Sequence, residues 1–309
     1  MKYKMTVLQE EFQIHQIVSV HYFEYMNDFT FAGESHNFWE FLYVDNGSVE
    51  ITANREQMTL TQGDIIFHKP NEFHAVASSG ATAPNLVVIS FDCGDPAMDF
   101  FEERILSVGM AERELLAQIL NEARANFSGP LDDPYLEQLV RADAPPFGSE
   151  QMIRTLLEQF LILLYRKHLP QRPVSVPKPD LRLASRQKDD IYGIILAYFE
   201  DHISETLTIR QVCRDNLVSP AQLKRAFRLH GDGGILRRFN LMKIEHAKQL
   251  IRNQKYNYTQ IADQLGYASI HYFSRQFKEL TGMTPTEYSA SLKQRTQQPL
   301  KRNLPQGLH

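Results

Sequence analysis

Cysteine is scarce in this chain of 309 residues. Cys93 and Cys213 are the only two, and they do not form a Cys-X-X-Cys pair. Disulfide-stabilised secreted domains need more cysteines than this, and cysteine-rich zinc modules need closely spaced pairs. The sequence therefore excludes a disulfide scaffold and a cysteine-based zinc finger, and it is consistent with a reducing compartment.

Long hydrophobic runs and common catalytic motifs are also missing. The longest apolar run, residues 160–165, is far shorter than the roughly 20 residues that cross a bilayer. The first five residues, Met-Lys-Tyr-Lys-Met, lack the apolar core of a signal peptide. No phosphate-cradling glycine motif or nucleophile elbow occurs. We therefore expect a cytoplasmic protein that does not bind membranes and is not an enzyme.

Charge is distributed unevenly along the chain. The whole sequence has 33 Lys and Arg against 37 Asp and Glu, a formal net charge of −4. Residues 188–309 hold 18 basic and 11 acidic side chains, whereas residues 1–187 hold 15 and 26. The mildly acidic total therefore hides a basic C-terminal segment, which is typical of modules that bind phosphate backbones.

The same basic segment contains a repeat with a period of 49 to 50 residues. The matched pairs are Val212 and Ile261, Cys213 and Ala262, Leu223 and Phe273, Arg225 and Arg275, and Phe227 and Phe277. In the first copy Ser219 and Pro220 favour the start of a second helix, and in the second copy Gly266 favours a left-handed turn. Two short helices joined by a tight turn predict a helix-turn-helix unit, whose second helix enters the DNA major groove.

The outward side chains of the two second helices suit base recognition. They are Ala221, Gln222, Lys224 and Arg225 in the first copy, and Ile270, His271, Ser274 and Arg275 in the second. Arg can read guanine, Gln can read adenine, and small apolar groups can contact the thymine methyl. Basic residues on a single helix often form only a solvated surface. Arginine at the matched position of two related helices favours contact with double-stranded DNA.

These motifs resemble the DNA-binding domain of the AraC-type transcription regulators, over residues 189–292. Residues 243–251 resemble the central helix of that family, and residues 277–288 resemble its C-terminal signature. The resemblance implies seven helices, with both recognition helices facing adjacent major grooves. It implies the base-reading positions named above, apart from Gln222, which rests on the exposed face alone. It also implies activation through contact with RNA polymerase.

One stretch departs from the family pattern. After Phe227 the first copy carries Gly231, Gly233 and Gly234, where the usual pattern has a Thr-Gly turn and one residue fewer. Glycine is conformationally permissive, so we expect a looser link between the first unit and the central helix. Whether the first unit contacts bases is left open.

The N-terminal half is rich in Val, Ile, Phe and Tyr and contains many turn residues. It predicts short strands at residues 17–25, 38–45, 48–54, 64–68, 74–78 and 86–91. Asp45-Asn46-Gly47 is a hairpin signal. A series of short strands of this kind is typical of a small β-barrel or jelly roll.

Two runs in this half, residues 34–47 and 63–74, resemble the first and second cupin motifs. Metal-binding cupins use three His and one Glu, and the matching positions here are Glu34, His36, Glu40 and His74. Two imidazoles and a carboxylate can hold a divalent metal. The alternative is that these side chains orient a small ligand or form ordinary hydrogen bonds inside the barrel. We expect no metal or other cofactor, because the resemblance to AraC-type regulators implies a sensor barrel that works without a metal.

A small polar molecule is the more plausible occupant of the barrel. The predicted ligand-binding residues are His36, Trp39, Glu40, Tyr43 and His74. A sugar suits such a set, because an aromatic ring can stack on its apolar face while His and Glu bind its hydroxyl groups. Ordinary core packing is the alternative role for Trp39, the only tryptophan.

Apolar stripes predict helices over residues 98–127 and 149–169, which either form a dimer contact or cover the barrel. Four prolines within residues 170–179 predict a semi-rigid linker.

The predicted domains are a cupin-like barrel (1–95), a helical segment for dimerisation (96–169), a linker (170–187), the double helix-turn-helix domain (188–292) and a polar tail (293–309).

The sequence therefore predicts an α+β two-domain fold and a ligand-responsive, DNA-binding transcription regulator. We expect a homodimer that activates carbohydrate-related genes in response to a sugar or sugar derivative. One alternative is a metal-dependent cupin enzyme fused to a DNA-binding domain. A second is a ligand-independent regulator whose barrel serves only for dimerisation.

Overall fold

The computed structural model describes residues 4–134, 136, 138–169, 191–229 and 234–297. The chain forms two compact units, which divide near residue 170, and the second extends to Leu292. The predicted linker at 170–187 lies outside the described residues, and of the predicted tail only residues 293–297 are described, as the end of a helix. The domain boundaries predicted from the sequence remain predictions.

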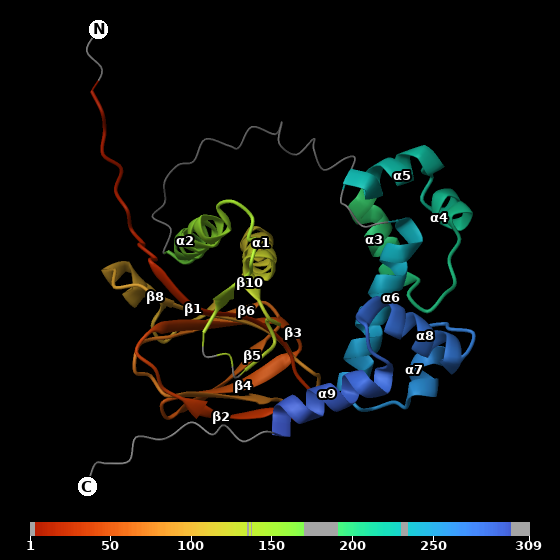
Figure 1. Ribbon diagram of the computed structural model, residues 1–309, viewed down its shortest axis with the longest axis horizontal. Helices are drawn as coiled ribbons and strands as arrows, with labels where there is room; N and C mark the ends of the chain where they lie inside the picture. Colours follow the sequence, from red (N-terminus) through yellow and green to blue (C-terminus); the bar gives the residue numbers. More distant parts are fainter. Residues whose placement is uncertain (1–3, 135, 137, 170–190, 230–233, 298–309) are drawn as a thin grey trace. The chain divides into compact units, whose positions relative to one another are not determined.

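The N-terminal unit is a sandwich of two antiparallel sheets (Figure 1). The five-stranded sheet has the order β1 (Gln16–Glu24), β8 (Asn85–Asp92), β3 (Trp39–Asn46), β6 (Asp64–His68) and β9 (Ile105–Ser107). The four-stranded sheet has the order β2 (Thr30–Glu34), β7 (His74–Ser78), β4 (Ser48–Ala53) and β5 (Glu56–Thr61). Because side chains alternate along a strand, each strand of the larger sheet has one inner and one outer face.

The structure contains strands that the sequence analysis did not predict. Strand β5 pairs with β4 across a turn in which Asn54 has a positive φ of 53°. Its sequence, Glu-Gln-Met-Thr-Leu-Thr, is largely polar because it forms the exposed edge of its sheet. Strand β2 is short and contains Gly33, which obscures its alternation. Edge strands such as these give a weak hydrophobic signal.

The helix predicted over residues 98–127 is wrong in its first part. Residues Pro96–Phe101 form the short 3-10 helix η1, β9 follows, and the α-helix α1 covers only Met110–Asn126. Glu103, between η1 and β9, has a positive φ of 54°, which a continuous helix would not allow. Glu112 accepts a hydrogen bond from the backbone N–H of Gly109 at 2.8 Å and so fixes the start of α1.

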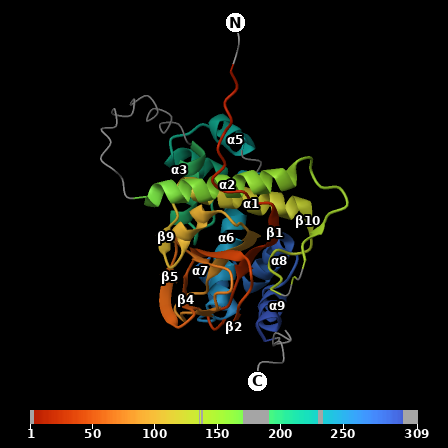
Figure 2. The same cartoon turned by 90° about the vertical axis from the view of Figure 1, so that its left-hand side faces the viewer.

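Helix α1 packs beside α2 (Ser149–His168) on the outer face of the five-stranded sheet (Figure 2). The apolar stripes of both helices belong to one core with the outward residues of the sheet, and the Phe160 ring lies 5.4 Å from that of Phe41. The stripes that were considered for a dimer contact are therefore buried within one protomer. This arrangement corresponds to the alternative in which the helices cover the barrel.

The C-terminal unit consists of seven helices in its described part: α3 (Ile191–Asp201), α4 (Ile209–Asp215), α5 (Pro220–Leu229), α6 (Ile235–Arg252), α7 (Tyr258–Gln264), α8 (Ile270–Thr281) and α9 (Pro285–Gln297). Thr208, Asn257 and Ser269 cap the starts of α4, α7 and α8 by accepting backbone N–H bonds. The local sequence therefore fixes both helix-turn-helix units.

Within the C-terminal unit, the central helix α6 connects the two helix-turn-helix units through Lys243. This lysine is 4% exposed, and its Nζ donates to the carbonyl oxygens of Glu205 at 2.6 Å and Leu265 at 2.7 Å. Glu205 precedes the first unit, and Leu265 ends the first helix of the second unit. Burial lowers the pKa of Lys243 to about 8. Gly266, which follows Leu265, lies against the backbone of Ser204. The turn of the second helix-turn-helix unit therefore packs directly on the loop before the first helix-turn-helix unit.

None of the helices in the described part of the chain has the length and hydropathy needed to span a bilayer.

Candidate functional site

A cavity of about 370 Å³ lies between the two sheets of the N-terminal unit. Its lining comes mainly from inward residues of β1, β3 and β8 on one side and of β2 and β7 on the other. The polar lining residues are Ser19, His21, Glu34, His36, Glu40, His74 and Ser90. The volume is within the range of small-molecule sites. The barrel is therefore hollow rather than packed shut, which argues against the alternative in which it serves only for dimerisation.

The strand register builds the polar end of this cavity. On β3, Glu40 lies opposite Ser90 of β8 and opposite His68 of β6. On the smaller sheet, Glu34 of β2 lies opposite His74 of β7. Ser90 donates a hydrogen bond of 2.6 Å to Glu40 Oε2. Strand pairing thus brings together Glu40 and Ser90, 50 positions apart, and Glu34 and His74, 40 positions apart.

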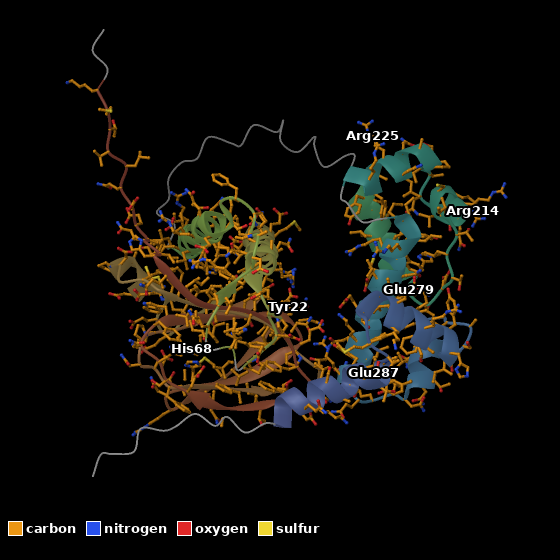
Figure 3. The ribbon with its side chains drawn as sticks, viewed as in Figure 1. Tyr22, His68, Arg214, Arg225, Glu279 and Glu287 are labelled. Atoms are coloured by element: carbon orange, nitrogen blue, oxygen red, sulfur yellow. The ribbon has the colours of Figure 1, made fainter. Side chains whose placement is uncertain are left out.

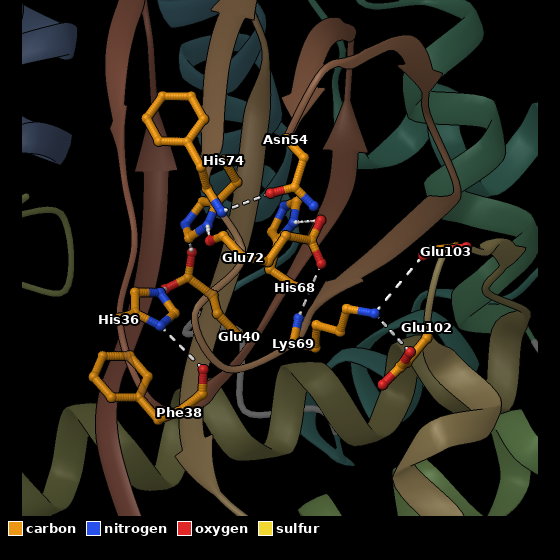
Figure 4. A network of polar contacts seen from close by, with 11 residues as sticks. His36, Phe38, Glu40, Asn54, His68, Lys69, Glu72, His74, Glu102 and Glu103 are labelled. Atoms are coloured by element: carbon orange, nitrogen blue, oxygen red, sulfur yellow. Dashed lines mark hydrogen bonds and ion pairs between the residues drawn. The ribbon is translucent and has the colours of Figure 1, made fainter.

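Glu40 stands at the centre of this polar cluster (Figure 4). Its Oε1 lies 3.3 Å from His74 Nε2, and its Oε2 lies 3.6 Å from His36 Nε2. Burial opposes ionisation of Glu40, but the imidazoles of His36 and His74 outweigh it and hold its pKa well below the usual range. Burial also opposes the charged form of His74, yet Glu40 raises the His74 pKa above its usual value. The two groups therefore form a buried ion pair.

A second layer of contacts supports His74. The ring of His68 stacks on that of His74 with centroids 4.2 Å apart, and His68 Nδ1 lies 3.5 Å from Glu72 Oε1. Glu72 Oε2 in turn accepts a bond from the backbone N–H of Lys69, whose Nζ donates to Glu102 at 2.8 Å (Figure 4). Burial lowers the pKa of His68, so this imidazole is neutral near pH 7. The layer fixes the orientation of the His74 ring.

The structure brings together three of the five predicted ligand-binding residues, His36, Glu40 and His74. The other two, Trp39 and Tyr43, are buried on the outer face of β3 in the core beneath α1 and α2. The prediction that they line the pocket is wrong, because odd-numbered residues of β3 face the helices and even-numbered ones face the cavity. Trp39 therefore has the core-packing role that was its alternative.

The sequence analysis did not predict that Ser19, His21 and Ser90 line the cavity. His21 Nδ1 lies 3.1 Å from the carbonyl oxygen of Leu131, and the hydroxyls of Ser19 and Ser90 lie 2.9 Å apart. Small or polar residues that alternate with Val and Ile in a buried strand were the available signal. The sequence could not say which face of that strand lines a cavity.

The cluster could also hold a metal ion. Glu34, His36, Glu40 and His74 each offer one ligand atom, and these atoms all lie within 4.8 Å of one another. Two imidazoles with two carboxylates suit a divalent transition metal. The four residues predicted from the cupin resemblance are therefore close enough to bind one metal ion together. That the protein works without a metal remains a prediction.

A larger hollow of about 750 Å³ lies outside the barrel, beside the start of β1 and one face of α2. The charged residues Arg141 and Glu150 in its lining form an ion pair with each other. Its polar lining residues, which also include Arg154, are exposed, in contrast to the polar cluster around Glu40. The barrel cavity is the better candidate for a ligand site.

The second candidate site is the exposed face of the recognition helices α5 and α8. Leu223, Phe227, Phe273 and Phe277 are buried, as the repeat predicts. The predicted base-reading residues on these helices are exposed or half-buried: Ala221, Gln222, Lys224, Arg225, Ile270, His271, Ser274 and Arg275. Figure 3 shows Arg225 pointing outward from α5. The structure leaves all eight side chains accessible, and their base contacts remain predictions.

Two of these residues have local contacts that bear on their role. The Gln222 amide oxygen accepts bonds from the backbone N–H and the hydroxyl of Ser219, so it caps α5 instead of extending freely. The Arg275 guanidinium carbon lies 5.2 Å from the ring centre of Tyr272. Stacking of this kind reduces the number of conformations that the arginine must lose on binding. Of the glycine-rich link between the first unit and α6, residues 230–233 lie outside the described residues.

Comparison with known proteins agrees with both candidate sites. Residues 16–99 match the family model described as an AraC-like ligand binding domain, and residues 212–291 match that of a helix-turn-helix domain. The chain is 22% identical over 276 residues to the HTH-type transcriptional activator RhaR of Yersinia pestis, with 84% of each chain covered. It is 26% identical over 140 residues to the uncharacterized HTH-type transcriptional regulator YpdC of Escherichia coli, covering 44% of this chain and 48% of that relative.

Among solved structures, the crystal structure of apo ToxT from Vibrio cholerae is similar, with 15% identity, a TM-score of 0.33, and coverage of 92% of this chain and 98% of that one. The relatives are transcription regulators, and the alternative of a metal-dependent enzyme is wrong. The paired helix-turn-helix units, the hollow barrel, the two family-model matches and the similarity to RhaR lead to one conclusion. The chain belongs to the AraC-type family of ligand-responsive, DNA-binding transcription regulators, with a cupin-like binding domain in front of its DNA-binding domain.

Proposed function

We propose that a sugar or sugar derivative binds in the barrel cavity and changes how the recognition helices act on a promoter. The observation that carries this proposal is the enclosed polar cluster around Glu40 at one end of the cavity. Its carboxylates can accept hydrogen bonds from several hydroxyl groups of a small ligand. We further propose activation of carbohydrate-related genes through RNA polymerase. The similarity to RhaR, a transcriptional activator, supports this direction of regulation.

The proposal predicts that the effector binds without a metal. A ligand that binds only the folded state raises Tm by an amount that grows with its concentration. We expect one class of sugar or sugar derivative to raise the Tm of the barrel equally with and without a chelator. Fluorescence of Trp39, the only tryptophan, reports on this unit selectively.

The same ligand should change transcription from the bound promoter in a purified system with RNA polymerase. His74→Ala removes one partner of the buried ion pair and should abolish the ligand-induced Tm shift. Glu56→Gln, on the exposed edge strand β5, is the control and should retain it. A Tm shift that requires added metal would contradict the metal-free sensor.

We propose that the protein acts as a homodimer on two half-sites and works in the cytoplasm, where its DNA target lies. The apolar stripes of α1 and α2 are buried in the protomer, so a dimer contact would use their remaining surface. Met110, at 80% exposed, and Met152, at 43% exposed, are apolar side chains on that surface. Asn126 at the end of α1 bonds Glu150 at the start of α2, so the two methionines lie at opposite ends of the pair and a contact along the whole pair would cover both.

Sedimentation equilibrium of the full chain should give twice the mass of 35.7 kDa. Met110→Lys together with Met152→Lys should shift the equilibrium at least tenfold toward monomer, because a buried interface must then accommodate two charges. Met283→Lys, an exposed change in the DNA-binding unit, is the control. A monomer at all concentrations, with or without DNA, would refute the dimer.

A further inference from the structure

The charge of the barrel cavity restricts the kind of molecule that it can bind. Among the described residues that line it, none is Lys or Arg, whereas Glu34 and Glu40 are both carboxylates. Glu40 Oε1 lies 3.3 Å from His74 Nε2 and its Oε2 lies 3.6 Å from His36 Nε2, so its carboxylate already has cationic or polar partners within the cavity wall. Glu34 lies opposite His74 in the β2–β7 pairing, so a second carboxyl group lines the same end of the cavity. A buried anion without a positive partner is unfavourable, so this end of the cavity disfavours a phosphate or carboxylate ligand.

The rest of the cavity is apolar, and it is lined by aromatic rings on one side. His21, Phe23, Tyr25 and Phe29 stack in succession, with ring centroids 4.8, 4.9 and 3.5 Å apart. Phe31 of β2 adds a further ring. Leu42, Val76, Leu86 and Val88 are among the aliphatic residues of the lining. A free sugar can stack only its small apolar face on one ring, and its remaining hydroxyls would lack partners against this larger apolar surface.

The polar and apolar parts together define an amphipathic ligand. We infer that the effector has a head of hydrogen-bond donors, an apolar body of about the size of an aromatic ring, and no negative charge. The head binds at Glu40, His36 and Ser90, and the body packs against the aromatic rings of Phe23, Phe29 and Phe31. This inference rests on the proposed function, in which the cavity binds a sugar derivative. Within that class it specifies a glycoside with an apolar aglycone, in preference to a free sugar or a sugar phosphate.

A matched ligand series tests the inference on the full chain by calorimetric titration in the presence of a chelator. For each of several common hexoses, the series contains the methyl glycoside, the phenyl glycoside and the phenyl glycoside 6-phosphate. We expect at least one phenyl glycoside to bind tenfold or more tightly than its methyl counterpart, because the ring buries apolar surface. We expect the 6-phosphate to bind at least tenfold more weakly than the uncharged phenyl glycoside.

Three variants assign these differences to the two parts of the cavity. Phe31→Ala should reduce the preference for phenyl over methyl and leave binding of the methyl glycoside nearly unchanged. Glu40→Gln should weaken both glycosides and reduce the discrimination against the phosphate. Glu50→Gln, an exposed change on β4, should bind as the parent does. Since Phe31 and Glu40 are half-buried, the Tm of each variant without ligand shows whether its barrel is folded.

The possible outcomes separate this inference from the proposed function. Equal affinity for methyl and phenyl glycosides, or tighter binding of the phosphate in chelator, overturns the inference while a sugar-responsive barrel stands. The amphiphile 2-phenylethylamine, titrated beside the series, has an apolar ring and a hydrogen-bond donor but no sugar. If it binds and no glycoside does, the result supports a non-anionic amphipathic ligand but overturns the sugar proposal. Binding of the phosphate only with added Zn²⁺ shows that a metal reverses the charge of the site, and it overturns the inference. Failure of every compound to bind counts against both.

Discussion

Replacing Gly266 by alanine is expected to lower the free energy of unfolding of the DNA-binding unit by about 3–5 kcal/mol. Two effects contribute, an unfavourable backbone conformation and a steric clash. Gly266 has φ of +64°, a conformation that costs an L-residue about 1–2 kcal/mol. A Cβ at this position would also lie 1.9 Å from the carbonyl oxygen of Ser204. That neighbour is backbone and cannot rotate away, so the loop before the first helix-turn-helix unit must move.

A second glycine in the same unit provides the control. Gly282, the cap of α8, has φ of +82°, but an added Cβ would meet no atom within 4 Å. Gly282→Ala should therefore cost only the backbone term of about 1–2 kcal/mol. The equivalent position in the first unit shows the same distinction. Leu217 has φ of 53° and is 94% exposed, so a side chain is tolerated there because nothing approaches it.

Thermal unfolding of the full chain measures this difference. Circular dichroism at 222 nm follows mainly the helical unit, and Trp39 fluorescence follows the barrel as an internal reference. We expect Gly266→Ala to lower the helical transition by more than about 12 °C, with the barrel transition unchanged. If Gly266→Ala and Gly282→Ala lower it equally, the close contact with Ser204 does not stabilise the fold.

Replacing Arg275 by alanine is expected to reduce specific DNA affinity roughly tenfold to a hundredfold, the usual contribution of a bidentate base contact. Arg275 is exposed on α8 beside His271 and Ser274, and its guanidinium is held over the Tyr272 ring. The buried faces of α8, Phe273 and Phe277, fix the helix so that this side chain points away from the core. Its loss should affect the specific site more than random DNA.

Arg275→Lys separates base reading from simple charge. Lysine keeps the positive charge but lacks the planar fork that matches guanine. We therefore expect Arg275→Lys to lose specificity while its salt dependence stays close to that of the parent, whereas Arg275→Ala loses specificity and reduces the salt slope by at most about one. Arg124→Ala, on α1 of the barrel unit, is the matched control and should bind as the parent does.

Fluorescence anisotropy at several salt concentrations, with a selected binding sequence and a scrambled duplex, measures both quantities. If Arg275→Ala binds the selected sequence as tightly as the parent, the assignment of α8 as a base-reading helix is wrong. If both variants lose affinity equally for the two duplexes, Arg275 contacts phosphate instead of a base.

The sequence predicted the C-terminal unit well because its signals are local. Caps such as Ser269 and Asn257, the turn at Gly266, and apolar residues three and four apart each act within one or two helical turns. The repeat then doubled every signal. The seven described helices and the exposure of the base-reading faces follow from information that lies close together along the chain.

The barrel site was predicted only in part, because its formation depends on pairing between distant strands. The sequence by itself determined that His36, Glu40 and His74 are polar residues within a β-rich, cupin-like segment. It could not determine which face of β3 lies toward the cavity and which lies toward α1 and α2, because apolar residues occur on both faces. Only the tertiary structure decided that Glu40 points inward and that Trp39 and Tyr43 point outward, since strand alternation defines two faces but packing decides which of them surrounds a cavity.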